Sequence, residues 1–212
     1  DFTGGLVVDG LTTDGYRDRS AYDSQDVGFS LERSLFDRVV VGSQGRRHHD
    51  DREFPGGLTF AEIDAFGRRA SSPLAPEDRG DVTSWAWDGW IEATATDTIS
   101  LHLLPYYFTR DETSRITSSV FGTFDTDAEK NQGGFDFQTR VDEPLFGLEN
   151  RVVFGMTWLS DAIDRQSAGS GPFPSLSRTR GEREVHGGFV QEELRPHPDL
   201  LAALGLRYDT AS

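Results

Sequence analysis

The stretch REVHGGFVQEELRPHPDLLAALGLRYD, residues 183–209, is the part of the chain that decides the fold class. From residue 202 to residue 209, apolar or aromatic residues alternate with small and charged ones. Between the two halves, RPHPD at 195–199 holds two prolines and an aspartate, which are residues that favour turns. Because successive side chains of a strand point to opposite faces, the stretch predicts two antiparallel strands joined by a tight turn. A soluble β-sandwich and a membrane barrel both contain such hairpins, so the rest of the chain must decide between them.

The composition excludes several classes of protein. The 212 residues are enough for one or two domains, and an aromatic content of 11% is too high for a disordered chain. Hydrophobic residues make up only 35%, and no apolar run is long enough for a membrane helix. The net charge of −15 argues against a nucleic-acid-binding surface and is compatible with cations or basic partners. The chain contains no cysteine, which by itself indicates little about its compartment.

The alternation of the closing stretch recurs along the whole chain. The clearest example is SWAWDGWIEATA at 84–95, where Trp85 and Trp87 share one face and Asp88 lies on the other. Most of these segments are close in length to the roughly 9–11 residues that a tilted membrane strand needs. Pro105 is unfavourable inside the predicted strand 99–110, because proline cannot donate a backbone hydrogen bond to a neighbouring strand. The predicted strands are 5–14, 25–33, 39–47, 84–95, 99–110, 133–142, 150–159 and the two of 183–209.

The lengths of the links between these segments distinguish the two fold classes. Four links are short, three are long, and the two kinds alternate after a modest first link at 15–21. The short links lie near 34–38, 96–98, 143–149 and 195–199, and the long ones at 48–82, 110–131 and 161–182. Outer-membrane barrels alternate in this way because tight turns lie on the periplasmic side and long loops outside. A Greek-key sandwich has no reason to keep this parity, so the pattern favours an all-β, antiparallel, up-and-down transmembrane barrel.

Two further features support the barrel. Aromatic residues gather near strand ends, as interfacial girdles require; they are Trp85, Trp87, Tyr106, Tyr107, Trp158 and Tyr208. The long link 48–82 is predicted to be an extracellular loop with a short helix. Within it, Thr59 and Glu62 have the spacing of a capping box ahead of LTFAEIDAFGRR. A soluble β-rich binding module remains the alternative.

Three stretches resemble TonB-dependent outer-membrane receptors, in particular the siderophore and ferric-citrate branch. They are DGYRDRS at 14–20, FPGGLTFAEIDAFGRRAS at 54–71 and GFVQEELRPHPDLLAALGLRYD at 188–209. The third, with its F-x-Q-[DE] strand, turn and LGLRYD strand, is the most specific. The resemblance implies that residues 1–212 are part of a 22-stranded barrel whose N-terminal plug domain is not in this sequence. The chain begins at Asp1 without a signal peptide and is expected to be a piece of a longer protein.

The resemblance also implies a function, a location and partners. The function is TonB-energised import of a ferric chelate, such as a siderophore or ferric citrate, across the outer membrane of a Gram-negative bacterium. The partners are TonB, engaged through the missing N-terminal part, the ferric chelate and outer-membrane lipid, with no nucleic acid. No resident cofactor is expected, because the ferric chelate is cargo. A passive porin-like or adhesive barrel is the alternative function.

Arginines near the predicted external ends are candidates for binding an anionic chelate, since guanidinium groups bind carboxylates bidentately. The preferred residues are Arg46, Arg47, Tyr106 and Arg110, which lie at the loop-proximal ends of their strands. The alternative is that these charges only solvate loops or pair with neighbouring acids. Inward-facing charges are expected to form a network on the lumen wall; they are Asp88, Glu92, Asp136, Arg140 and Arg207.

Other chemistry finds little support in the sequence. The run HHDD at 48–51 contains metal-ligating residue types, but adjacent residues of a strand point to opposite faces and cannot converge on one ion. No GxSxG, HExxH or phosphate-loop motif is present. His102 has no identified nucleophile or orienting partner, so the chain is not predicted to be an enzyme. The sequence does not specify which chelate is transported.

Overall fold

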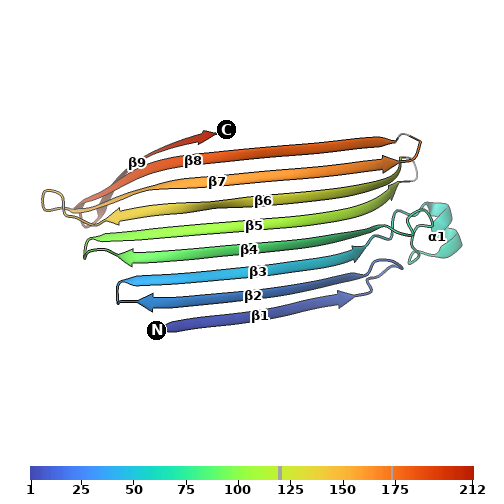
Figure 1. Ribbon diagram of the computed structural model, residues 1–212, viewed down its shortest axis with the longest axis horizontal. Coiled ribbons are helices and arrows are strands. Elements are labelled where there is room, and N and C mark those ends of the chain that lie inside the picture. Colours follow the sequence, from blue (N-terminus) through green and yellow to red (C-terminus); the bar gives the residue numbers. More distant parts are fainter. Residues whose placement is uncertain (119–120, 173) are drawn as a thin grey trace.

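Nine antiparallel strands form one sheet in which each strand pairs with its neighbours in chain order (Figure 1). The computed structural model describes residues 1–118, 121–172 and 174–212. The strands are β1 (Phe2–Thr13), β2 (Tyr22–Leu35), β3 (Val39–Glu53), β4 (Arg79–Thr94), β5 (Ile99–Ser118), β6 (Gly122–Val141), β7 (Glu149–Ser170), β8 (Ser175–His197) and β9 (Leu200–Ala211). The predicted all-β, up-and-down arrangement and the number of strands are confirmed. Among the described residues β1 and β9 each pair on one side only, so the sheet is open.

The two faces of the sheet differ in chemistry. Residues in register on neighbouring strands share a face, so Trp87, Tyr107 and Gly133 lie in one row on β4, β5 and β6. We call this face the apolar face. Its apolar residues include Leu6, Val8, Val27, Phe29, Leu31, Val39, Val41, Trp85, Trp87, Ile91, Leu101, Leu103, Phe135, Phe137, Phe154, Met156, Trp158, Val190, Leu204, Leu206 and Tyr208. We call the opposite face, which carries Asp88, Asp136 and Arg140, the polar face.

The apolar side chains are exposed rather than packed against other parts of the chain. Trp87 is 41% and Phe154 43% exposed, and Leu206 on β9 is 70% exposed. Within the described ranges, the only buried hydrophobic side chains are Ala75 and Val82. A soluble sandwich buries one face of each sheet in a core about 10 Å thick, and this sheet has no such core. The exposed apolar face therefore favours the wall of a barrel over a soluble sandwich. No helix in the described part of the chain is both long and apolar enough to cross a membrane.

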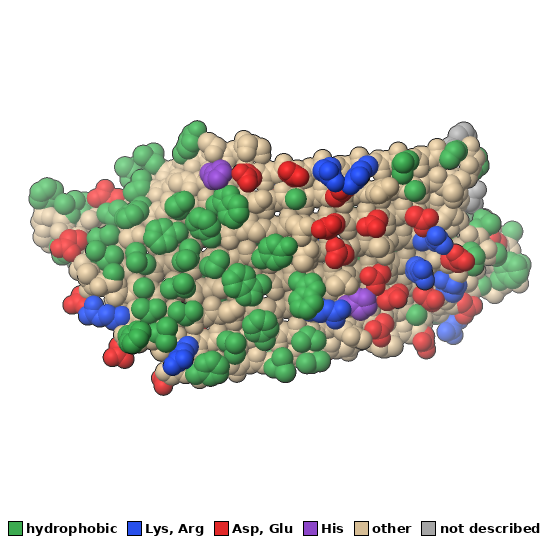
Figure 2. All heavy atoms as spheres, viewed as in Figure 1, with side chains coloured by type: hydrophobic (Ala, Val, Ile, Leu, Met, Phe, Trp, Pro, Cys, Tyr) green, Lys and Arg blue, Asp and Glu red, His purple; other side chains and the backbone are tan. Residues whose placement is uncertain are grey.

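The apolar residues cover only part of the apolar face, as Figure 2 shows. Hydrophobic side chains gather towards one end of the sheet, and acidic and basic side chains cover the end that carries the helix α1. We call the first region the apolar belt. Its border contains the aromatic residues Trp85, Tyr107, Trp158 and Tyr208. Strands β5 to β8 are 20, 20, 22 and 23 residues long, about twice what crossing a membrane requires.

The prediction of long links at 110–131 and 161–182 is wrong. Strand β5 continues to Ser118 and β6 begins at Gly122, while β7 continues to Ser170 and β8 begins at Ser175. Residues 119–120 and 173, at the centres of these predicted links, lie outside the described residues. The extensions are polar on both faces, so they lack the hydrophobic alternation by which strands are recognised, although backbone pairing continues. Cross-strand ion pairs between charged side chains support them; the pairs include Arg115–Asp125, Arg178–Asp164 and Arg180–Asp164.

The predicted loop 48–82 is likewise too long. Residues 48–53 belong to β3 and 79–82 to β4, so the link itself is 54–78. The predicted helix is present as α1 (Phe60–Phe66), and the capping box at its start is confirmed. The Thr59 backbone N–H donates to Glu62 Oε2 at 2.7 Å, and the Glu62 N–H donates to Thr59 Oγ1 at 3.3 Å. The hydrogen bond from the Thr59 backbone lowers the pKa of Glu62.

The links alternate between the two ends of the sheet. One end, the turn end, carries the links 36–38, 95–98, 142–148 and 198–199. The other, the loop end, carries the link 14–21, the link 54–78 with α1, and the links from β5 to β6 and from β7 to β8 (Figure 1). The predicted assignment of each link to one end is therefore correct, although only 54–78 is long.

Several glycines leave room for an aromatic side chain of a neighbouring strand. A Cβ atom added to Gly42 on β3 would overlap the indole of Trp90 on β4. A Cβ atom on Gly134 would lie 2.6 Å from the hydroxyl oxygen of Tyr106, and one on Gly155 would lie 2.8 Å from the ring of Phe189. Such aromatic–glycine pairs fix the register of neighbouring strands and explain part of the high glycine content.

We expect Gly42→Ala to destabilise the full-length protein by about 2 kcal/mol, because the Trp90 ring must leave its position. Gly28→Ala is the matched control, since a Cβ atom there meets only the Gly45 carbonyl oxygen at 3.6 Å. The control should change stability by less than about 0.5 kcal/mol. Urea unfolding in lipid vesicles, followed by tryptophan fluorescence, measures both. Equal effects of the two substitutions would contradict the role of the Trp90–Gly42 pair.

An ion network fixes the link between β6 and β7 at the turn end. Arg151 Nε donates to Asp142 Oδ1 at 2.9 Å, and Arg140 Nε lies 2.6 Å from Asp142 Oδ2. Arg151 also lies 3.5 Å from Glu193 on β8. Burial raises the pKa of Asp142, but the hydrogen bonds from Arg151 and Arg140 outweigh it and hold the pKa below the ordinary value of 3.8.

Asp142→Asn should therefore lower the free energy of unfolding at pH 7 by roughly 0.5–1 kcal/mol. A carboxyl group with a depressed folded-state pKa stabilises the fold above its unfolded pKa, and loses this contribution as pH falls through the folded pKa. The difference between wild type and variant should thus shrink below pH 3.8. Glu143→Gln is the control, because Glu143 forms no ion pair within the described residues. A pH-independent difference would count against the network.

Candidate functional site

The structure brings three of the four predicted ligand-binding residues to one face. Arg46 on β3 and Tyr106 and Arg110 on β5 all lie on the polar face. Arg47 lies on the apolar face, because adjacent strand residues point in opposite directions. Its guanidinium carbon is 5.5 Å from the centre of the Trp85 ring, a cation–π contact at the border of the apolar belt. Arg47 is therefore separated by the sheet from the other three.

Arg46 belongs to a ladder of alternating charges on the polar face of β2 and β3. Its Nε donates to Asp26 Oδ1 at 2.8 Å, and His48 Nδ1 lies 3.1 Å from the same oxygen. His48 Nε2 lies 3.0 Å from Asp50, which accepts from Arg52 Nε at 2.9 Å. In the run HHDD, His48 and Asp50 thus lie on the polar face, whereas His49 and Asp51 lie on the apolar face. Arg46 is already paired, although its side chain remains 65% exposed.

Tyr106 and Arg110 follow one another along the polar face of β5. Tyr106 is in register with Asp88 on β4, and its ring lies over Gly134 on β6. Arg110 Nη2 donates to Glu112 at 2.9 Å, and its buried Nε atom has no hydrogen-bond partner within the described residues. Since the buried Nε cannot be reached by a ligand, the donors of Arg110 that remain for a further group are those of its two terminal nitrogens.

Three more cations lie beside Arg110 on the polar face, one on each of the next three strands. Lys130 on β6 is in direct register with Arg110. Arg165 on β7 pairs with Ala128, two residues from Lys130, and Arg183 on β8 pairs with Asp161. We call Arg110, Lys130, Arg165 and Arg183 the cation row. A groove of about 320 Å³ is lined by the first three of these residues, together with Glu112 and others.

The cation row has fewer acidic partners than cations. Glu112 pairs with Arg110, and Asp161 lies 3.3 Å from Arg183 and 3.9 Å from Lys130. Arg165 forms no ion pair or hydrogen bond within residues 1–118, 121–172 and 174–212. The surplus of positive charge over the groove suits an anionic ligand with several oxygen acceptors.

Sequence reasoning missed three members of the cation row. Lys130 lies in the predicted long link 110–131, where no strand register was expected, and Arg183 is the first residue of the predicted strands of 183–209 but was not considered as a ligand-binding residue. Arg165 lies in the predicted long link 161–182 and could not be placed beside Arg110 from the sequence. If the strands had been predicted to continue through 122–132 and 161–170, the alternation of side chains would have placed Lys130 and Arg165 on the same face.

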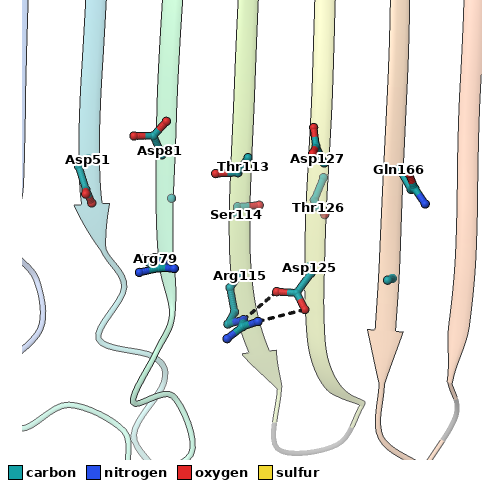
Figure 3. A pocket seen from close by; sticks show the side chains of 12 residues that line it. Asp51, Arg79, Asp81, Thr113, Ser114, Arg115, Asp125, Thr126, Asp127 and Gln166 are labelled. Atoms are coloured by element: carbon teal, nitrogen blue, oxygen red, sulfur yellow. Dashed lines mark hydrogen bonds and ion pairs between the residues drawn. The ribbon is translucent and has the colours of Figure 1, made fainter.

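A second groove, of about 580 Å³, lies on the apolar face beyond the belt (Figure 3). Asp51, Asp81 and Asp127 line it together with Arg79 and Arg115. In Figure 3, the carboxylate of Asp125 points at the Arg115 guanidinium, with a closest distance of 2.7 Å. The groove opens on the face that continues the belt, opposite the cation row. We therefore do not assign the ligand to it.

An antiparallel sheet with one exposed apolar face, an aromatic border and a polar inner face defines the wall of a membrane β-barrel. The comparison with protein families agrees: the family described as "TonB dependent receptor-like, beta-barrel" matches residues 2–212. The chain belongs to this family, which confirms the resemblance of its three motifs. This family is one of receptors and transporters rather than enzymes.

Solved structures show the same fold. The ferric citrate transporter FecA in its unliganded form matches with a TM-score of 0.80 and 16% identity, over 99% of this chain and 32% of that chain. The ferric yersiniabactin uptake receptor FyuA from Yersinia pestis matches with a TM-score of 0.80 and 13% identity, over 99% and 34%. The RagAB peptide transporter matches with a TM-score of 0.66 and 10% identity, over 91% and 28%.

At these identities the structural likeness establishes the fold alone. The chain spans about a third of the length of the structures it matches. No curated protein sequence matches the chain.

Proposed function

We propose that this chain is part of the barrel wall of an outer-membrane receptor that imports a ferric chelate with energy supplied through TonB. The observation that carries the proposal is the cation row, which lies on the polar face towards the loop end. In a closed barrel the polar face lines the lumen, so a ligand entering from outside would meet this row. Membership of the receptor family and the likeness to FecA and FyuA support iron-chelate uptake as the general activity.

The residues proposed to face the ligand are Arg110, Lys130, Arg165 and Arg183, with Arg46 and Tyr106 beside them. Arg165 has no counterion within the described residues, and only Nη2 of the Arg110 guanidinium donates a hydrogen bond there. Groups of this kind favour a chelate with exposed carboxylate or phenolate oxygens over a neutral one. The proposed cargo is therefore an anionic ferric siderophore or ferric citrate, held transiently and not as a resident cofactor.

The apolar belt is proposed to contact outer-membrane lipid. Its exposed aliphatic and aromatic side chains meet the hydrocarbon region, which for outer-membrane barrels is a band about 25 Å tall. The aromatic border, with Trp85 and Trp158, lies at the interface, and Arg47 extends over the Trp85 ring towards the headgroups. The location is the outer membrane of a Gram-negative bacterium.

A passive porin-like or adhesive barrel is the competing function, because the wall alone does not require energy. The two differ in their dependence on TonB. Uptake of ⁵⁵Fe-labelled chelates should be measured in cells that carry the full-length receptor, with and without a functional TonB. The panel should contain ferric citrate, a ferric catecholate and a neutral ferric hydroxamate. Saturable uptake that disappears without TonB supports the proposal, and uptake that persists identifies a passive barrel.

Arg165→Gln should weaken binding of the preferred anionic chelate about tenfold, because it removes a charge-assisted hydrogen-bond donor from the cation row. Arg47→Gln is the matched control, since it removes the same charge from the opposite face of the sheet. The control should bind with unchanged affinity. Binding of ⁵⁵Fe-labelled chelate to intact cells at low temperature measures both variants. A larger effect at Arg47 than at Arg165 would place the ligand elsewhere.

A further inference from the structure

Two stretches that are far apart in the sequence form one unit at the loop end. The link 14–21 carries Arg17, and the link 54–78 carries α1. Arg17 Nε and Nη2 donate to the Ala70 carbonyl oxygen at 3.2 and 2.8 Å, and Nη1 donates to the Gly56 carbonyl oxygen at 2.9 Å. Because Gly56 precedes α1 and Ala70 follows it, a single guanidinium joins both ends of the segment that contains the helix.

Neighbouring contacts strengthen this junction. The Asp18 backbone N–H donates to the Arg69 carbonyl oxygen at 2.7 Å, and Arg69 Nε donates to the Tyr16 carbonyl oxygen at 3.0 Å. The Arg69 guanidinium carbon also lies 5.3 Å from the centre of the Tyr16 ring. Gly56 has a φ of 66°, and a Cβ atom there would lie 2.8 Å from the Cβ of Ala75, so the glycine is required where the link folds back.

The helix itself has no buried residue that would fix its position, and Phe60 and Phe66 are 88% and 62% exposed. A helix of seven residues is also far too short to be stable by itself. The position of α1 therefore depends on the hydrogen bonds at the base of the link, of which Arg17 supplies three.

The link is also tied to the strand that carries Arg110. Asp78, at the end of the link, is 1% exposed and accepts from the backbone N–H and the hydroxyl of Thr117 on β5, both at 2.7 Å. Glu77 pairs with Arg115 on the same strand at 2.6 Å. Both anchor points on β5 lie further towards the loop end than Arg110. The link is thus fixed at one end to the β1–β2 link and at the other to the loop end of β5, on the face opposite the cation row.

We propose that Arg17 is a positioning residue for ligand capture: it holds the link 54–78, with α1, in one preformed arrangement at the loop end, where a ligand would enter from outside. A preformed loop does not have to be ordered when the ligand binds, so affinity is higher than for a mobile loop. Arg17 itself need not touch the ligand. This inference rests on the proposed function, since it assigns the residue a role in capture.

The test compares Arg17→Gln, Arg17→Lys and the control Arg68→Gln in the full-length receptor. Arg68 lies in the same link and forms no hydrogen bond or ion pair within the described residues. The probe is the ⁵⁵Fe-labelled chelate of the panel that the wild type binds most tightly. Affinity and the number of sites are measured on intact cells, and barrel integrity is measured by the heat-dependent shift on gel electrophoresis. Trypsin cleavage after Arg68 or Arg69 reports on order in the link.

Arg17→Gln should lower the affinity about tenfold, with the number of sites and the heat-dependent shift unchanged, and should speed cleavage after Arg69. Arg17→Lys should restore part of the affinity, because a lysine donates to one carbonyl group but cannot bridge two in the same way. Arg68→Gln should bind like the wild type. These results together support the inference.

Three results would overturn it, and they are distinguishable. If the wild type binds the probe and Arg17→Gln binds it equally well, Arg17 has no part in capture, whatever the cleavage rate. If the wild type binds no chelate of the panel, the proposed function itself fails, and the capture role fails with it. A loss of sites together with loss of the heat-dependent shift, in Arg17→Lys as well as in Arg17→Gln, would make Arg17 a folding residue and would also overturn the inference.

Discussion

The alternation of side chains along an extended strand is the constraint on which the rest of this structure depends. Backbone pairing in register transmits the alternation from strand to strand, so nine strands share one apolar and one polar face. In lipid, the same pairing satisfies the backbone hydrogen bonds that water cannot reach. Without a packed protein core, the apolar face has to be covered by something other than this chain. The fold and its environment are therefore two consequences of one pattern.

The sequence predicted this pattern well where one face is apolar. The segments around Trp87, Phe137 and Phe154 showed it directly, and the number of strands and the end to which each link belongs followed from it. The prediction failed where both faces are polar, as in 110–118 and 161–170. There the strands are maintained by backbone pairing and by ion pairs between neighbouring strands, such as Arg178–Asp164, and these depend on a register that composition does not reveal.

The candidate site illustrates the same limit at the level of single residues. Arg46, Arg47, Tyr106 and Arg110 were chosen for their position at the loop-proximal ends of strands, and the alternation of side chains separates Arg47 from the other three. The partners of Arg110 come from three other strands, and only the register brings Lys130 opposite to it. The contact between the DGYRDRS and FPGGLT motifs was equally invisible, because nothing in either motif indicates that Arg17 bonds to Gly56 and Ala70.

The central claim is that one face of this sheet meets lipid while the other lines a passage that admits polar ligands. Spin labels placed singly at 152–159 of β7 in the full-length receptor, reconstituted in lipid vesicles, test it most directly. Labels at Val152, Phe154, Met156 and Trp158 should be accessible to oxygen dissolved in lipid, and labels at the residues between them should not. An accessibility that does not alternate, or that is highest at the intervening residues, would contradict the account.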